Sequence, residues 1–249
     1  MDLRSWHTNA TAALAVLAVC SLSSFAQATD HNNIAAGRPL RFDDARTIEL
    51  GDQQIELGFG LTGIRDFAPL YTFGLQYRTG FAAQQQFGVG INHFIANGNS
   101  DTGTVFFHYM RELSVADSDD AFGFVVNVGA PYGTGSDDTE VNLRGVATRA
   151  MGGGDRLHVN ADFILGEHRP GLGLILGYSR PLGGDVNQTL VGEVGINRLV
   201  SDEWILTLGL GIRRQFNDRA VLDFGILFGG LNRDDNRTAT FNIGYSMSF

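Results

Sequence analysis

The chain has 249 residues and a formal net charge of −9 at neutral pH, with 18 basic residues against 27 acidic ones. This acidic balance argues against a nucleic acid as the partner. Glycine and phenylalanine are abundant, with 33 and 18 residues, and Cys20 is the single cysteine. The composition therefore indicates short strands and turns, and it excludes an intramolecular disulfide framework.

The first 28 residues have the features of a secretory signal peptide. A short polar start precedes an apolar run from residue 12 to residue 22, and Ala26-Gln27-Ala28 provides a small-residue cleavage pattern. The apolar run is too short for a transmembrane helix, which needs about 20 residues. We therefore expect residues 1–28 to be removed. Lipoprotein processing at Cys20 is the alternative, which the bulky Val19 disfavours.

Residues 29–50 show no clean alternation of apolar and polar side chains. The segment carries charges of both signs at Arg38, Arg41, Asp43, Asp44 and Arg46. We therefore expect it to precede the regular strands without forming one.

From residue 51 onward, apolar residues occupy every second position in stretch after stretch, with turn-like residues between the stretches. Successive side chains of a strand point to opposite faces, so each stretch predicts a strand with one apolar face. We count twelve candidate strands. The first has Ile55, Leu57, Phe59 and Leu61 on its apolar face. The fourth is less clean because Phe106 and Met110 fall on the polar face, and the sixth, with Val141 and Leu143, is the weakest.

The last strand carries the clearest pattern. Its small and polar residues alternate with an entirely apolar and aromatic face formed by Phe241, Ile243, Tyr245, Met247 and Phe249. This ending resembles the C-terminal signal of bacterial outer-membrane proteins. In those proteins the barrel-insertion machinery reads a terminal aromatic residue. The resemblance implies the barrel-assembly machinery and outer-membrane lipids as partners.

Together these patterns predict an all-β fold, a transmembrane antiparallel up-and-down β-barrel of about twelve strands over residues 51–249. An even strand number returns both chain ends to one side of a bacterial outer membrane. Closure follows because an open edge in lipid leaves unpaired backbone groups. A soluble β-sandwich is the alternative, but it should carry charges on its outward faces, whereas here charges and glycines share a face. Residues 29–50 then form either a periplasmic segment or a small plug in the lumen.

On this register the inward face carries charges of both signs. They are Glu56, Arg78, Arg144, His158, Asp162, Glu193, Arg213 and Asp223. One interpretation is a lattice of charge pairs that holds the wall. The other is a polar conduit in which these groups select solutes. Phe94, Phe106, Ile175 and Leu227 also face inward, either as patches for a hydrophobic solute or as filling.

A second resemblance covers residues 38–56. The sequence Arg38-Pro39-Leu40, then Asp43-Asp44-Ala45-Arg46-Thr47, then Gly51 through Glu56, is similar to the opening of an outer-membrane family of proposed transporters in the MetA pathway of phenol degradation. Beyond these residues the resemblance is architectural. It implies a channel for small solutes, including aromatic or hydrophobic ones. It offers no catalytic residue to transfer.

Covalent and metal chemistry find little support. Gly58, Gly60 and Gly63 match a dinucleotide fingerprint in spacing, but they lie in an alternating strand and its turn rather than before a helix. The six histidines form no metal-ligand spacing, so we expect neither a metal nor a cofactor.

Two other functions remain as alternatives to a channel. The first is an outer-membrane lipid-modifying enzyme, with His93, Ser100 and Asp101 as the triad near the outer rim. The sequence that starts at His93 lacks the His-x-Ser-Asn-Gly pattern of outer-membrane phospholipases. The second is a non-transporting structural barrel, and we favour a channel without enzymatic activity over both.

Overall fold

The computed structural model describes residues 39–64, 68–96, 102–115, 118–133, 139–166, 170–182, 187–198, 204–233 and 237–249. The expected signal peptide, residues 1–28, lies outside these ranges. No helix of the described part is long and apolar enough to cross a membrane.

The described residues form twelve β-strands, as expected from the alternation. In chain order they are β1 (Gln53–Ile64), β2 (Leu70–Ala82), β3 (Gln85–Ala96), β4 (Thr102–Glu112), β5 (Ala121–Gly133), β6 (Glu140–Gly152), β7 (Asp155–Leu165), β8 (Gly171–Pro181), β9 (Gln188–Arg198), β10 (Ile205–Asn217), β11 (Ala220–Gly229) and β12 (Thr238–Ser248).

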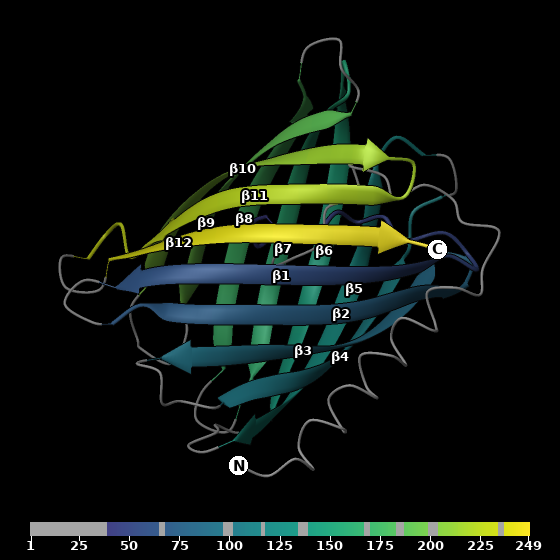
Figure 1. The fold of residues 1–249 in the computed structure, drawn as a ribbon. Helices are drawn as coiled ribbons and strands as arrows, with labels where there is room; N and C mark the ends of the chain where they lie inside the picture. The colour runs from purple at the N-terminus through teal and green to yellow at the C-terminus, as the bar shows by residue number, and fades with distance from the viewer. Residues whose placement is uncertain are drawn as a thin grey trace.

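Each strand pairs antiparallel with its neighbours in the sequence, and β1 closes the sheet on β12 (Figure 1). The closing ladder is continuous from Gln54 opposite Ser248 to Ile64 opposite Thr238. All described strands therefore have partners on both sides, and the predicted up-and-down barrel is confirmed. Closure matters because a sheet edge in lipid would leave backbone groups without hydrogen bonds.

The two faces of the wall differ as the alternation predicts. In β8, Leu172, Leu174 and Leu176 are exposed on the outside, whereas Ile175 and Ser179 on the opposite face are buried. The last strand follows the same rule: Phe241 is exposed, Ile243, Tyr245 and Met247 are half-exposed, and the serines of the opposite face are buried. Phe249 follows β12 and is itself buried, and its backbone N–H donates to the Gln53 carbonyl at 3.0 Å.

Residues 39–50, here called the inner segment, run around the inside of the wall. Followed backwards from residue 50, the segment pairs or hydrogen-bonds in turn with β2, β3, β6, β7, β9 and β12. The wall partners, in that order, are Gly80, Gln86, Thr148, Asn160, Glu193 and Asn242. The order of contacts matches the order of strands around the barrel, so the segment winds along the wall.

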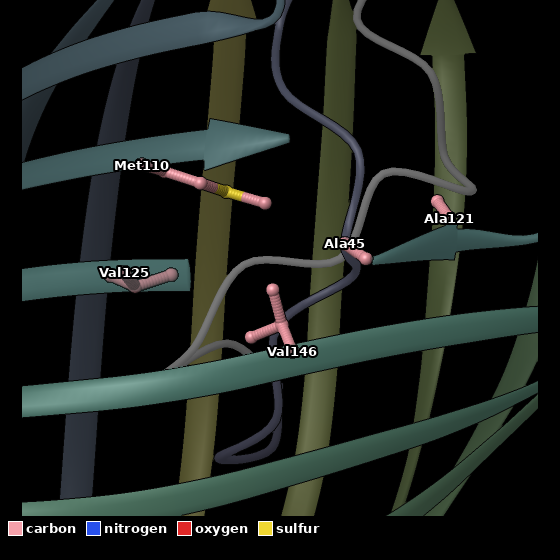
Figure 2. Close-up of a cluster of buried hydrophobic side chains, with 5 residues drawn as sticks. All are labelled: Ala45, Met110, Ala121, Val125 and Val146. Atoms are coloured by element: carbon pink, nitrogen blue, oxygen red, sulfur yellow. The ribbon is translucent and has the colours of Figure 1, made fainter. Parts of the chain in front are cut away.

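Apolar side chains of the wall cover the apolar side chains of the inner segment. Leu40 and Phe42 pack with Ile175 and Val191. Figure 2 shows the second cluster, in which Ala45 lies among residues of β4, β5 and β6, namely Met110, Ala121, Val125 and Val146. The apolar residue that interrupted the polar face of β4, Met110, therefore has a packing partner inside the lumen.

Glycines of the wall let the side chains of the inner segment approach the wall backbone closely. A Cβ atom on Gly177 would lie 2.7 Å from Cγ of Phe42, nearer than packed carbon atoms allow. The Phe42 ring also lies 4.8 Å, centroid to centroid, from the ring of His158 on β7. Phe42 therefore occupies a niche that only glycine leaves open.

This niche gives a first testable prediction. Replacing Gly177 by Val should overpack the niche and lower the free energy of unfolding by about 1–3 kcal/mol. Gly145→Val is the matched control, because Gly145 is exposed and a Cβ there meets nothing within 4 Å. Urea unfolding in lipid vesicles measures both variants. Equal free energies of unfolding for Gly177→Val and Gly145→Val would contradict the packing of Phe42 against Gly177.

Candidate functional site

A cavity of about 470 Å³ lies inside the barrel beside the inner segment. Its wall comes from β1 to β6 and β12, and Arg41 and Asp43 of the inner segment contribute to its lining. The side chains of the lining are mostly polar. The amides are Gln76, Asn92, Asn127, Asn142 and Asn242.

Glycines of the wall determine where the cavity lies, because they place no side chain in the lumen. Gly58, Gly60 and Gly74 line it on β1 and β2. On the neighbouring β3, a Cβ atom on Gly90 would lie 2.4 Å from the ring of Phe106, so that ring lies across the strand. The opposite side of the lumen, along β7 to β11, is occupied by Pro39 to Asp44. One half of the bore is therefore filled and the other half stays open.

Ion pairs hold the inner segment to the wall where it borders the cavity. The Arg144 guanidinium donates to Asp162 at 2.7 and 3.0 Å and to Asp43 at 2.7 Å. Glu193 accepts from the Arg41 side chain at 2.8 Å and from the Arg41 backbone N–H at 2.7 Å. Arg41 and Asp43 of the segment thus each meet an opposite charge of the wall, which offsets the cost of removing them from water.

A further ion pair joins Asp44 of the inner segment to Arg156 of β7. The Arg156 guanidinium donates to the fully buried Asp44 carboxylate at 3.2 Å. Burial raises the pKa of the Asp44 carboxyl above its ordinary value, and the charge of Arg156 opposes that shift.

The charge pair on the β1 and β2 side of the cavity has a longer nitrogen–oxygen distance than the pairs of Arg144 and Arg41. Arg78 and Glu56 approach to 3.5 Å, and the same Arg78 nitrogen, Nη2, donates to Gln76 at 3.0 Å. Both Arg78 and Glu56 are buried and line the cavity. These two charges therefore lie in the cavity wall on the β1 and β2 side.

The eight charged or titratable residues expected to face inward have different surroundings. Glu56, Arg78 and Arg144 line the cavity. Asp162 and Glu193 are absent from its lining and pair with Arg144 and Arg41.

The other three are buried away from the cavity. Arg213 and Asp223 form a pair at 2.7 Å between β10 and β11. His158 lies between the hydroxyls of Thr148 and Ser179, at 3.0 Å from each. The described interior thus contains both a lattice of charge pairs and a polar cavity, and the selection of solutes by these groups stays a prediction.

Sequence reasoning did not identify the contribution of the inner segment to the site. Arg41 and Asp43 line the cavity but lie outside the strands. Outside a strand, the alternation of side chains does not predict which way a residue points. A signal was available in the inward apolar residues of the wall. Met110, Val125 and Val146 interrupt polar faces, and the inner segment covers them.

The residues expected to matter in the enzyme alternative are only partly described. Nδ1 of His93 lies 3.0 Å from the hydroxyl of Tyr132. Ser100 and Asp101 lie outside the described residues, so the triad cannot be assembled from them. Within the described ranges, no group of three or more His, Cys, Asp or Glu side chains is arranged to hold a metal ion.

The Arg144 network gives a second prediction. Replacing Arg144 by Ala leaves Asp43 and Asp162 buried without this cation, and we expect the free energy of unfolding to fall by about 3 kcal/mol or more. Arg149→Ala is the control, since Arg149 is an exposed residue of the same strand. A loss no larger than that of the control, in urea unfolding, would show that the pairs do not stabilise the barrel.

Comparisons with known proteins support the fold. No family model matches the chain, and no curated protein matches its sequence. The specific resemblance to the MetA-pathway family therefore stays a prediction. Among solved structures, the COG4313 outer membrane channel from Pseudomonas putida F1 superposes with a TM-score of 0.64 at 12% identity, covering 87% of this chain and 100% of that one.

Two porins are also similar. The KdgM porin has a TM-score of 0.61 at 7% identity, covering 78% of this chain and 99% of its own. The NanC porin has a TM-score of 0.59 at 8% identity, covering 78% and 98%. At such identities the likeness is one of fold, and the fold is that of bacterial outer-membrane barrel channels.

Proposed function

We propose that this protein is a passive channel of the bacterial outer membrane, through which small polar solutes diffuse along the lumen. The observation that carries the proposal is the polar cavity of about 470 Å³ beside the inner segment. An apolar outer face suits lipid and a polar inner face suits water, as in membrane barrels generally. The similarity of the fold to several porins supports the same function.

The lining of the cavity favours solutes that form hydrogen bonds. Most of its residues carry amide, hydroxyl or charged side chains, and Phe106 supplies an inward-facing aromatic ring. A purely hydrophobic solute would displace water from these polar groups without replacing its hydrogen bonds, which is unfavourable. We therefore propose polar solutes in place of the aromatic or hydrophobic ones that the family resemblance implies.

The inner segment narrows the passage and contributes to its charge. Arg41 and Asp43 line the cavity from the segment, opposite the Arg78–Glu56 pair of the wall. The proposal includes no covalent chemistry, no cofactor and no nucleic-acid partner. Outer-membrane lipids and the barrel-assembly machinery are the partners expected for the apolar outer face and for β12.

Conductance tests the proposal. Purified protein in planar lipid bilayers should give stepwise ion currents, and Asn127→Trp, which fills the cavity from β5, should reduce the step size several-fold. Phe124→Trp is the matched control, because Phe124 is exposed on the outer face of the same strand. Absence of current with hydrolysis of the bilayer lipids would favour the enzyme. Absence of both would favour a structural barrel.

Ion preference gives a further prediction. Arg78 lines the cavity, so Arg78→Gln should shift the reversal potential in a salt gradient toward preference for cations. Arg180→Gln is the control, since the Arg180 side chain is 62% exposed and is not part of the lining. An unchanged reversal potential in Arg78→Gln would contradict the route through this cavity.

A further inference from the structure

Two polar atoms of the cavity lining lack a hydrogen-bond partner among the described residues. They are Nε of Arg78, a donor, and Oδ1 of Asn142, an acceptor, and both atoms are buried. The Arg78 side chain as a whole is only 6% exposed. Buried polar groups are nearly always hydrogen-bonded, so a donor and an acceptor left unpaired in one cavity require an explanation.

Arg78 is less tightly held than other buried arginines of the barrel. Arg144 and Arg213 each donate to a carboxylate at 2.7 Å, whereas Arg78 lies 3.5 Å from Glu56. Because Nε is covered, its proton reaches a solute only if the guanidinium turns. The long contact with Glu56 opposes such a turn less than a short, two-point pair would.

The two unpaired atoms flank one hollow. On β3, which lies between Arg78 on β2 and His108 on β4, Gly88 and Gly90 provide no side chain. A Cβ atom on Gly88 would lie 3.2 Å from Cγ of Arg78, so this side chain extends across β3.

On β4, β5 and β6, beyond these glycines, the wall carries a row of polar side chains. Nδ1 of His108 lies 2.9 Å from Oδ1 of Asn127, and Asn127 stands directly opposite Asn142 in the ladder between β5 and β6. Arg78 and Asn142 therefore lie at the two ends of one row of wall residues along the cavity, with His108 and Asn127 between them.

We propose that this hollow is a binding subsite for a small hydroxycarboxylate. The Arg78 guanidinium donates to the carboxylate, and Oδ1 of Asn142 accepts from a hydroxyl group. A carboxylate fits the first position because hydrogen bonds between a guanidinium and a carboxylate are charge-assisted and stronger than neutral ones. A hydroxyl fits the second because Oδ1 of Asn142 has no partner among the described residues, and the half-buried amide brings this covered atom to the cavity when it turns.

The size of the cavity agrees with such a ligand. A volume of about 470 Å³ accommodates a small molecule. Arg41 and Arg144 of the lining are held by short ion pairs, whereas Arg78 has only the 3.5 Å contact with Glu56, so Arg78 is the cation offered to the ligand. The inference rests on the proposed function, because it names the solute class that the lumen would hold.

Equilibrium binding of sodium gluconate to the full-length, detergent-solubilised protein tests the subsite. Gluconate carries a carboxylate and hydroxyls, sorbitol carries hydroxyls alone, and hexanoate carries a carboxylate alone. We expect gluconate to bind more tightly than either. Arg78→Lys keeps the charge and removes Nε–H, and it should weaken gluconate about tenfold while leaving sorbitol unchanged.

Asn142→Ala should weaken gluconate about fivefold and leave hexanoate unchanged. Arg180→Lys, outside the cavity, should bind all three compounds as the wild type does. Heat-modifiable migration in gels checks that each variant is folded.

Gluconate binding no tighter than sorbitol, or equal affinity in Arg78→Lys and Arg180→Lys, would overturn the subsite. Conductance measured on the same preparations separates this failure from failure of the channel. Stepwise currents without selective gluconate binding reject the subsite alone. Selective binding without currents rejects the channel and retains the subsite.

Discussion

The structure depends on the need of every backbone N–H and C=O group in lipid to find a partner within the protein. The ladder between β1 and β12 meets this need by closing the sheet. Closure then fixes the direction of every strand side chain, because alternate positions face the lipid or the lumen. The interior of a closed barrel must be filled with side chains, with another segment or with water, and in this chain the inner segment fills part of the lumen and leaves a cavity beside it.

The inner segment fills one half of the lumen and leaves the other half open. Its fit relies on small residues where it touches the wall, as at Gly177 beneath Phe42. Its charges are matched by wall charges far away in sequence, as in the Arg41–Glu193 pair. Opposite the filled half, glycines of β1 and β2 keep space free, and the amides and the Arg78–Glu56 pair around that space form its polar lining. Packing on one side thus sets the position of the cavity on the other.

The strands and their two faces could be predicted from the sequence because a period of two residues is a local property. The same parity correctly placed Glu56, Arg78 and Arg144 inside the barrel, where they line the cavity. It could not show that Arg213 would be paired away from the cavity while Arg78 borders it, since that depends on which half of the lumen is filled. The inner segment has no period, and its partners are distant in sequence, so its course was left open between the periplasm and the lumen. Met110 and Val125 are apolar residues on inward faces, and they were the one local sign in the sequence that a segment packs inside the barrel.

The central claim is that the inner segment winds along the inner wall and shapes the passage. A disulfide between Pro39→Cys and Gly211→Cys, in a chain whose Cys20 is replaced by Ala, tests it most directly. A Cβ atom on Gly211 would lie 3.0 Å from Cβ of Pro39, so a small outward shift brings the two positions to the spacing of about 3.5–4.5 Å found in disulfides. The pair Pro39→Cys and Gly145→Cys, with Gly145 exposed on β6, is the control. The account predicts that mild oxidation of the folded barrel links the first pair and not the second. Free thiols in the first pair, both labelled by a water-soluble maleimide, would contradict it.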